Sequence, residues 1–390
     1  MICKRVVIKN YRNISEAEVD FCDGLNVLIG NNAQGKTNLI ESIYHIALGK
    51  PFRFGKESDL IRFGEENARI QLFFESEKRE RTQNISYNLA LGKRKTVTLN
   101  GVKMTKTADF IGNVRVVLFC PEHLEIVKGG PSVRRDFTDV AISQLRPVYV
   151  RDLIEFEKNL KNRNAILSEA QENNTNKIDI DSFSVWSEMV ARHSARISYF
   201  RESYIKKLCD KVNVIFGEMT DGKERIEIIY SSSISKLLQE GEDHSDMQKT
   251  ALLYSKRLQE NLEKEILAGT TLYGAHRDNI EILINGQNAR LFASQGQQRS
   301  ITLALKLAES EICLEDSGEF PILLLDDVMS ELDKKRREYL MNYLRGRQAI
   351  ITTCEGISGE DQIDSSFPYE NANVIFVKNG EYSPFSKIQS

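Results

Sequence analysis

The sequence predicts an α/β fold in which both ends of the chain build one head and the middle supplies a helical insert, a short helical-hairpin lobe. An apolar run at 25–29 passes through a glycine-rich bend into apolar residues at helical spacing. A second apolar run, at 322–325, ends in two aspartates and is typical of a strand buried on both faces. From about 131 to 267, apolar residues recur mostly at helical spacing. We therefore expect a head of residues 1–130 plus 268–390 and a lobe of residues 131–267.

The composition excludes several classes of protein. The 390 residues suffice for two or three domains, and no apolar run approaches the ~18 residues of a membrane helix. The N-terminus resembles a strand and lacks the features of a signal peptide, so we expect a cytoplasmic protein. A net charge of −3 excludes a uniformly basic nucleic-acid binder but not a local basic face. Scattered cysteines without a CxxC pair predict reduced, mostly buried thiols: Cys3, Cys22, Cys120, Cys209, Cys313 and Cys354.

Local patterns predict the remaining elements. Two apolar stripes at helical spacing, joined by the polar loop at 172–181, predict an antiparallel helical hairpin, and the stripe that begins at Trp186 is expected to form part of its core. The pairs Asn100-Gly101 and Asn285-Gly286 are hairpin turns. Strands are expected at 2–9, 14–21, 25–29, 68–75, 84–91, 95–99, 114–119, 280–284, 322–327 and 349–353.

The bend at 30–37 reads GNNAQGKT and matches the phosphate-binding loop G-x-x-x-x-G-K-[ST], with a strand before it and a helix after it. Its glycines let the backbone wrap an anion, and successive N–H groups then face the phosphates. We expect Lys36 to reach the β and γ phosphates and the Thr37 hydroxyl to ligate Mg²⁺. The loop predicts nucleoside triphosphate binding by Gly30, Asn31, Asn32, Ala33, Gln34, Gly35, Lys36 and Thr37.

Two aspartates end the apolar strand at 322–325. A carboxylate in this place can hold Mg²⁺ directly or through water, and we assign that role to Asp326. Asp327 is then positioned to orient or deprotonate the attacking water, which makes it, with Lys36, the candidate catalytic residue. The alternative is a pair of acidic residues that merely open a loop, which is common. The presence of a phosphate loop weakens that alternative.

Ser294, Gln295, Gly296 and Gln297 open an apolar helix and resemble the signature motif of the ABC-type ATPases. A serine hydroxyl, a glycine backbone and a helix N-terminus form an anion site. In that superfamily the motif closes over the γ-phosphate of another subunit, so that two heads enclose two ATP molecules. The alternative is an ordinary helix cap. Ser330 and Asp333 resemble the D-loop that reaches across such a dimer, although Ser330 could also cap a helix.

Besides the ATPase motifs, six short segments are distinctive: residues 10–13 (NYRN), 59–64 (DLIRFG), 121–124 (PEHL), 129–131 (GGP), 134–135 (RR) and 274–278 (GAHRD). With these segments, nearly the whole chain resembles one family of ABC-type ATPases, the RecF family. Two departures are visible. The segment from 274 usually reads GPHRDD in that family, and Ala275 and Asn279 differ from it. Thr353 stands where many ABC ATPases have a histidine, a substitution that RecF-like chains share.

The resemblance implies an ABC-type P-loop ATPase head and a function in recombinational repair and replication-fork maintenance. RecF-like proteins dimerise on ATP and bind duplex DNA and single-strand/double-strand junctions at gaps. They act with RecR and RecO to load RecA onto DNA coated with single-strand-binding protein. DNA-dependent ATP hydrolysis would release the dimer from DNA, so that the protein acts as a clamp. We expect this hydrolysis to be slow, because the side chain of aspartate at position 327 is one methylene shorter than that of glutamate.

Further roles follow from the same resemblance. Arg12 resembles an arginine that contacts nucleotide phosphate in related SMC-type heads; the alternative is a solvated arginine at a strand end. His276 and Arg277 would couple the signature to the lobe or serve as structural hydrogen-bonding groups, and the role of Pro121 and Glu122 stays open. Candidate DNA contacts, although composition favours an ordinary solvated charge for any single one of them, are Lys93, Arg94, Lys95, Lys103, Arg134 and Arg135.

Three rival classes share part of these patterns. An ATP-binding subunit of an ABC transporter would have the three motifs but not the other RecF-like segments. An overcoming-lysogeny-type nuclease would need a further metal-dependent nuclease domain, and only about 60 residues follow Asp327. An SMC-like DNA-tethering ATPase, the nearest alternative, would need hundreds of heptad residues between the two halves of the head.

Overall fold

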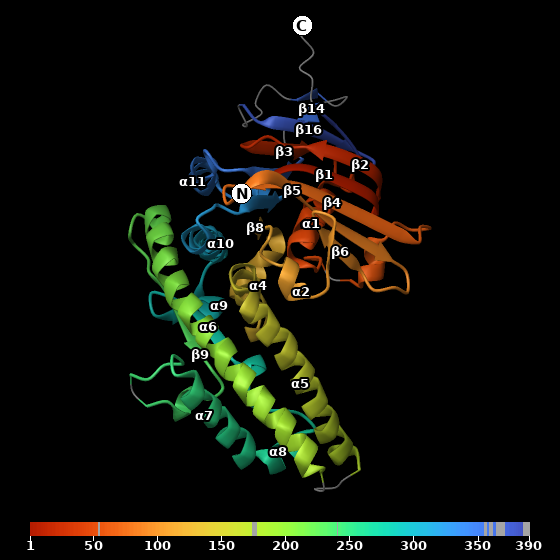
Figure 1. Ribbon diagram of the computed structural model, residues 1–390. Helices are drawn as coiled ribbons and strands as arrows, with labels where there is room; N and C mark the ends of the chain where they lie inside the picture. The colour runs from red at the N-terminus through yellow and green to blue at the C-terminus, as the bar shows by residue number, and fades with distance from the viewer. Residues whose placement is uncertain are drawn as a thin grey trace. The chain divides into compact units, whose positions relative to one another are not determined.

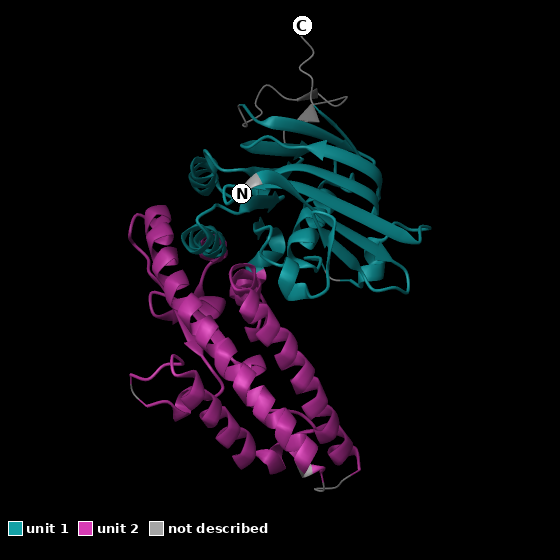
Figure 2. Cartoon of the chain, in the orientation of Figure 1, with its two compact units in different colours: residues 1–124, 302–390 teal, residues 125–301 magenta. Residues whose placement is uncertain are grey.

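The chain forms two compact units, which Figure 2 shows in different colours. Unit 1 contains residues 1–124 and 302–390, and unit 2 contains residues 125–301. The computed structural model describes residues 1–53, 55–173, 178–239, 241–354, 357–358, 362–363 and 371–384.

Unit 1 contains a mostly parallel sheet of strand order β17-β16-β3-β13-β12-β8. Figure 1 labels β3, β8 and β16 of this sheet. All neighbours pair in parallel except β16 and β17. Each residue of the three strands β8, β12 and β13 is buried, which explains their apolar sequences. The strands are β3 (Leu25–Ile29), β8 (Val116–Phe119), β12 (Ile322–Asp326), β13 (Ala349–Thr353), β16 (Asn373–Lys378) and β17 (Glu381–Pro384).

A second, antiparallel sheet has the order β2-β1-β4-β5-β6-β7. Asn100 and Gly101 both have positive φ, at 51° and 81°, as the predicted two-residue hairpin turn requires. Helix α1 (Lys36–Leu48) contacts strands of both sheets and is buried along nearly its whole length. The strands are β1 (Ile2–Tyr11), β2 (Ile14–Asp20), β4 (Asn67–Ser76), β5 (Arg79–Ala90), β6 (Thr96–Leu99) and β7 (Val102–Met104).

Short helices and one long helix complete unit 1. Gly49 ends α1 with a φ of 69°, as expected from its place after the last apolar residue. Helix α10 (Gln295–Ser317) begins in unit 2 and continues into unit 1. The other elements are η1 (Glu57–Leu60), α2 (Thr107–Phe110), η2 (Pro121–Leu124), η5 (Met329–Glu331), α11 (Lys334–Leu344), β14 (Ile357–Ser358) and β15 (Gln362–Ile363).

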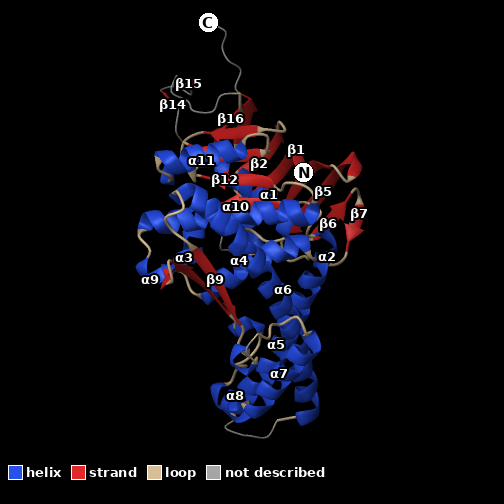
Figure 3. Ribbon diagram, turned by 90° about the vertical axis from the view of Figure 1, so that its left-hand side faces the viewer, coloured by secondary structure: helices blue, strands red, loops and turns tan. Residues whose placement is uncertain are grey.

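Unit 2 is mainly helical (Figure 3). Helix α6 (Ile180–Thr220) packs against α5 (Pro147–Glu172) and α7 (Met247–Glu260). The predicted apolar stripe of α6 packs inward, since Val190, Ile197 and Tyr204 are buried, whereas Trp186 and Phe200 are half-buried. The remaining helices are α3 (Glu125–Lys128), α4 (Pro131–Leu145), η3 (Ser235–Leu237), α8 (Leu262–Ala268), η4 (Ala275–Arg277) and α9 (Ala289–Phe292).

A small sheet in unit 2 explains why the observed units divide differently from the predicted domains. Strand β9 (Ile226–Ser231), which lies within the segment predicted as mostly helical, pairs with β10 (Asn279–Ile284), and β10 pairs with β11 (Gln287–Asn288). This pairing places residues 268–301 with the helical unit and not with the head. The domain assignment from the sequence stays a prediction. No helix among the described residues is long and apolar enough to cross a bilayer.

Candidate functional site

The phosphate-binding motif occupies the bend between strand β3 and helix α1. Gly35 has a φ of 118°, a conformation that residues with a side chain rarely adopt. Gly30 is required for a different reason, because a Cβ atom there would lie 2.3 Å from the carbonyl oxygen of Val377 on β16. One glycine of the motif therefore serves the turn, and the other allows a neighbouring strand to approach closely.

The side chains of Lys36 and Thr37 point to two parts of this bend. Lys36 is buried, and its Nζ donates to the carbonyl oxygens of Gly30 and of Asn31, the latter at 2.9 Å. The Thr37 hydroxyl donates to Asp326 Oδ1 at 2.9 Å. The structure thus brings Thr37, the neighbour of Lys36 in the motif, into contact with Asp326, from which it is separated by 289 positions in the sequence.

Asp326 is buried at the end of β12 and accepts a second hydrogen bond, 2.8 Å long, from Thr352 on β13. Burial raises its pKa, since the charged carboxylate loses water, while the hydrogen bonds from Thr352 and Thr37 oppose the rise. Divalent cations offset such a cost, and a hydroxyl beside a carboxylate offers the oxygen ligands that Mg²⁺ prefers. The described residues contain no group of three or more acidic, histidine or cysteine side chains that could hold a metal. A cation here would depend on phosphate and water oxygens for its other ligands.

Asp327 lies just beyond the strand, exposed and with a φ of 51°. Its N–H donates to Thr352 Oγ1 at 2.9 Å, and the Ser330 hydroxyl donates to its carbonyl oxygen at 2.9 Å. Ser330 therefore holds the turn that carries Asp327, and it does not cap helix α11. Asp333 caps that helix by accepting from the N–H of Arg336 at 2.9 Å.

The hairpin of β16 and β17 supports the loop, and sequence reasoning missed it. Tyr382 donates its hydroxyl to the Gly35 carbonyl oxygen at 2.9 Å, and burial raises the pKa of this phenol. Gln34 accepts through Oε1 from the N–H of Asn379 at 2.7 Å. The pair Asn379-Gly380 between two apolar runs was the available signal, because such a pair favours a two-residue hairpin.

Cys354 is a second residue that sequence reasoning missed. It was expected, with the other cysteines, among mostly buried thiols; Cys3, Cys120 and Cys313 are buried, but Cys354 is exposed. Its Sγ accepts from Lys36 Nζ at 3.2 Å, and the thiol donates to Asn32 Oδ1 at 2.9 Å. The only signal in the sequence was its position directly after a strand that ends beside the loop.

Arg12 at the end of β1 has a buried partner in α1. Its Nε donates to Glu41 Oε2 at 2.8 Å, and Arg53 Nη2 donates to the same oxygen at 2.8 Å. Burial acts to raise the pKa of Glu41, but the two arginines more than offset it and leave the pKa below the ordinary value of 4.5. Arg12 is thus not the solvated arginine of the alternative interpretation.

A groove of about 870 Å³ lies beside this cluster, within the size range of small-molecule sites. Asn13 connects the groove to the loop, since its Nδ2 donates to Ala33 O at 3.5 Å while its Oδ1 accepts from Asn38 Nδ2 at 2.6 Å. No single motif predicted this groove, because its lining comes from four separate segments of the chain. It is lined by Arg12, Asn13, Asn38, Ser58, Asp59, Ile61, Arg62, Phe63, Gly64, Glu65 and Leu91.

Replacing Glu41 with glutamine is expected to destabilise unit 1. The change leaves two partly buried guanidinium groups without a counter-charge, at a cost on the order of 2–3 kcal/mol, less than for a fully buried pair because both arginines retain some solvent. Because the native pKa of Glu41 is lowered, its contribution is present above pH 4.5 and disappears as the pH falls through the native pKa. Urea unfolding at pH 7 and at pH 3.5 measures this.

The matched control is Glu18→Gln, which removes an exposed carboxylate that pairs with Arg5 on the same sheet. Surface pairs contribute about 0–1 kcal/mol, so this variant is expected to unfold like the parent at both pH values. A loss at Glu41 that is no larger than that at Glu18, or that persists unchanged at pH 3.5, contradicts the prediction.

The signature residues lie at the start of α10 in unit 2. The Ser294 hydroxyl accepts from the N–H of Gln297 at 3.3 Å, while Gln297 Oε1 accepts from the N–H of Ser294 at 2.7 Å. This is a capping box, so the ordinary-cap interpretation describes the isolated chain correctly. Ser294 and Gln295 are nevertheless exposed, whereas Gly296 and Gln297 are half-buried.

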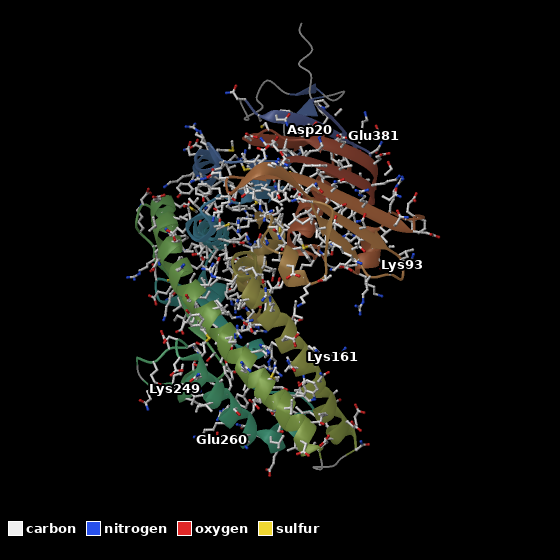
Figure 4. The ribbon with its side chains drawn as sticks, in the orientation of Figure 1. Asp20, Lys93, Lys161, Lys249, Glu260 and Glu381 are labelled. Carbon is white, nitrogen blue, oxygen red and sulfur yellow. The ribbon has the colours of Figure 1, made fainter. Side chains whose placement is uncertain are left out.

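The candidate DNA-contacting cations separate into two groups. Arg134 is buried and donates through Nη1 to Gly129 O at 2.8 Å, and Arg135 donates to Asp278 O at 2.6 Å. Both guanidinium groups are therefore committed to backbone carbonyls within unit 2, which does not suit a phosphate contact. Lys95 pairs with Glu57. Exposed positions are occupied by Lys93, Arg94 and Lys103, and Figure 4 shows Lys93 at the outer end of the antiparallel sheet.

His276 and Arg277 make structural contacts within unit 2. His276 Nε2 and Arg277 Nη2 lie 3.0 and 3.2 Å from the carbonyl oxygen of Thr271. Burial lowers the pKa of His276 to about 4, so it is neutral at pH 7 and donates this hydrogen bond. The next residue, Asp278, is fully buried and accepts from Arg201 at 3.0 Å and from Tyr230 at 2.6 Å. Thr353, the predicted switch position, is buried at the end of β13.

Comparison with known proteins agrees with these motifs. The chain is 37% identical over 384 residues to the DNA replication and repair protein RecF of Bacillus mycoides (strain KBAB4), a match that covers 97% of this chain and 98% of the relative. The RecF protein of Acetivibrio thermocellus is 39% identical over 355 residues, 91% of this chain and 94% of the relative.

Solved structures give the same picture. A structure of the recombination mediator protein RecF with ATP, from the RecFOR pathway, superposes with a TM-score of 0.88 at 33% identity, over 98% of this chain and 97% of that one. The Smc head domain from Pyrococcus furiosus shares the fold, with a TM-score of 0.55 at 16% identity over 98% of this chain and 95% of that one. A family described as the RecF/RecN/SMC N terminal domain matches residues 2–361. The chain therefore belongs to the RecF family of SMC-like ATPases.

Proposed function

We propose that this chain is an ATP-gated DNA-binding protein of recombinational repair and replication-fork maintenance. The observation that carries the proposal is the contact of Thr37 with buried Asp326, 2.9 Å apart beneath the loop that holds Lys36. The RecF–ATP structure supports ATP as the nucleotide. Lys36 would bind the β and γ phosphates, and the groove beside Arg12 is large enough for the nucleoside.

Residues at the site would divide the chemical work. Thr37 and Asp326 would hold Mg²⁺, which supplies charge neutralisation at the phosphates. Asp327, placed on a turn held by Ser330 and Thr352, would orient or deprotonate the attacking water. Hydrolysis would be slow and DNA-dependent, so that it limits the lifetime of the ATP-bound state and does not drive rapid repeated catalysis.

The exposed cap of α10 supports an ATP-dependent homodimer. Ser294 and Gln295 are exposed at this cap and would receive the γ-phosphate bound by a second copy, while Ser330 and Asp333 would reach across the dimer as the D-loop. ATP would then add contacts between two copies, and hydrolysis would remove them. In the cytoplasm, such a clamp would act at gapped DNA with RecR and RecO to help load RecA.

The length of the helices does not favour an SMC-like tether. The longest helices among the described residues are α6, with 41 residues, and α5, with 26. At 1.5 Å per residue, α6 is roughly 60 Å long, too short to hold distant DNA segments together. We therefore retain the clamp as the single proposed function.

Fluorescence anisotropy on gapped DNA, duplex and single strand, each with Mg·ATP and with Mg·ADP, tests the proposal. We expect tight binding only with ATP and preferentially to DNA that contains duplex. Replacing Lys93 and Arg94 together with glutamate is expected to weaken binding several-fold to all sequences and to reduce the salt dependence by about one unit of slope per lost phosphate contact.

The matched control is Lys161→Glu, an exposed lysine on α5 in unit 2 (Figure 4). DNA affinity that is indifferent to the nucleotide, or absent in every state, would leave an ATPase with some other partner. An equal loss of DNA affinity in the Lys93/Arg94 and Lys161 variants would mean that the net charge of the protein determines DNA binding, and not the outer end of the antiparallel sheet that carries Lys93 and Arg94.

A further inference from the structure

Exposed apolar side chains flank both halves of the proposed ATP site. Phe63 is fully exposed and Leu91 is 50% exposed, and both line the groove beside Arg12 in unit 1. Leu291 and Phe292 are 72% and 65% exposed and end helix α9 in unit 2. Isolated exposed apolar residues are normal, but neighbours gathered at one place mark an interaction surface. We call Phe63 and Leu91 the groove patch, and Leu291 and Phe292 the signature patch.

The groove patch is held by well-formed backbone. Phe63 is the second residue of a turn in which the N–H of Glu65 donates to Arg62 O at 3.0 Å, and Gly64 supplies the positive φ of 88°. The N–H of Arg62 donates to Asn10 O on strand β1 at 2.9 Å, which fixes the turn to the sheet. Phe63 is therefore displayed on ordered backbone, and a contact would lose little conformational freedom when it forms.

The signature patch is equally fixed, and it is continuous with the signature. Asn288 caps α9 by accepting from the N–H of Arg290 at 3.0 Å, and Ala289 is fully buried beneath it. Gln298 Nε2 in the first turn of α10 donates to Ala293 O at 3.0 Å. Only Ala293 separates Phe292 from Ser294, so whatever meets the signature lies within reach of these two side chains.

A second copy of this chain is the occupant that fits both patches. In the proposed dimer, Ser294 of one copy faces the phosphate loop of the other, and the groove patch lies beside that loop because Asn38 belongs to the first turn of α1. Charges of both signs border the groove patch, namely Glu65, Glu66, Lys93 and Arg94, whereas exposed Arg290 adjoins the signature patch. The choice of a second copy therefore rests on the continuity of the signature patch with Ser294.

We propose that Leu291 and Phe292 of one copy pack over Phe63 and Leu91 of a second copy and close the groove around the bound nucleotide. This inference rests on the proposed function, since it presupposes the ATP-dependent dimer. It adds an apolar contact to the phosphate contacts of the signature. The contact buries apolar surface only when two copies associate, so it favours the dimer. It would also exclude water from the nucleoside part of the bound nucleotide.

A double-mutant cycle on Phe63 and Phe292 tests the contact. Sedimentation velocity with Mg and the slowly hydrolysed analogue ATPγS measures the dimer dissociation constant of the parent, of Phe63→Ser, of Phe292→Ser and of the double variant. Each single variant is expected to weaken dimerisation about tenfold or more, from the loss of one buried aromatic side chain. The double variant is expected to be no more than about threefold weaker than either single variant, because each ring loses the same partner.

Two controls separate this contact from general effects. Leu267→Ser and Val102→Ser remove side chains of similar exposure, 76% and 67%, from elsewhere in units 2 and 1 and are expected to dimerise like the parent. Affinity of the monomer for a fluorescent ATP analogue is expected to change less than about threefold in Phe292→Ser, because that residue lies in the other copy's site.

The outcomes distinguish the inference from the function on which it rests. Single variants within twofold of the parent, or losses that multiply in the double variant, overturn the contact while the ATP-dependent dimer stands. Loss of DNA affinity with an unchanged dimer would assign the patches to another partner and also overturn it. A parent chain that stays monomeric with ATPγS refutes the proposed dimer itself, and this contact with it.

Discussion

Lys36→Met is expected to lower ATP affinity by about 100-fold or more and to abolish ATP-dependent dimerisation. Lys36 Nζ lies among the carbonyl oxygens of the loop, where phosphate oxygens would replace or share its hydrogen bonds. Charge-assisted hydrogen bonds are worth roughly 1.5–3 kcal/mol each, so the loss of one or two accounts for a change of this size. Methionine keeps an unbranched side chain one atom shorter than that of lysine and removes the charge and the donors. Titration calorimetry with Mg·ATP and sedimentation with ATP measure the two effects.

The control for this variant is Lys9→Met, which removes an exposed lysine from strand β1 of the same unit. It is expected to bind ATP and to dimerise like the parent. A modest loss of stability in Lys36→Met, about 1–3 kcal/mol, is expected because the buried carbonyls of the loop lose their donor. Thermal unfolding separates that loss from the loss of binding. A Lys36→Met variant that still dimerises with ATP would refute the enclosure of ATP between two copies.

The local part of the site could be predicted from the sequence. The strand, the glycine bend and the helix at 25–48 follow one another without a gap, so periodicity and turn chemistry identify them directly. The proximity of Thr37 and Asp326 could also be predicted. Thr37 belongs to the phosphate-binding loop, Asp326 ends the acidic strand, and both were expected to hold the same Mg²⁺ ion. The capping box at Ser294 was an alternative for the same residues, and the structure shows that the cap is real.

The rest depends on which distant segments pair, and one sequence does not show that. Thr352 matters because β13 lies between β3 and β12, and nothing in its own neighbourhood indicates this order. Tyr382 supports the loop because β16 pairs with β3 after a separation of more than 340 positions. Strand β9 is short, and its partner β10 begins about 50 residues later. Because the segments that flank β9 in the sequence show helical spacing, β9 was not predicted as a strand.

The basic residues show a different limit. Arg134 and Arg135 read as charges available to a phosphate, but Arg134 is buried beneath β10 and both donate to main-chain carbonyls. A guanidinium carries five donors and can satisfy carbonyls that no other group reaches. Composition alone does not distinguish an arginine that binds main-chain carbonyls from one that binds DNA. Solvent exposure in the structure makes this distinction, and it leaves Lys93, Arg94 and Lys103 as the candidate DNA contacts.

Ser294→Arg is expected to leave ATP binding by the monomer within about twofold of the parent and to abolish dimerisation and ATP-dependent DNA binding. In the proposed dimer, Ser294 meets the γ-phosphate held by the other copy, so the substitution is expected to act on dimerisation and not on nucleotide binding by a monomer. An arginine at this exposed cap would fill the space that the γ-phosphate of that copy needs. Calorimetry on dilute protein and sedimentation with ATP report the two properties separately.

Loss of the cap is the competing explanation, and Ser294→Ala isolates it. Both substitutions remove the hydroxyl that accepts from the N–H of Gln297, at a cost of about 0.5–2 kcal/mol. Both are expected to fold, because α10 has 23 residues and its apolar face, from Ile301 to Ile312, is buried. If Ser294→Ala dimerises measurably with ATP and Ser294→Arg does not, at similar melting temperatures, the added side chain and not the lost cap blocks the interface. If Ser294→Arg also loses ATP binding as a monomer, the signature is misassigned, and the second half of the ATP site must lie elsewhere in the chain.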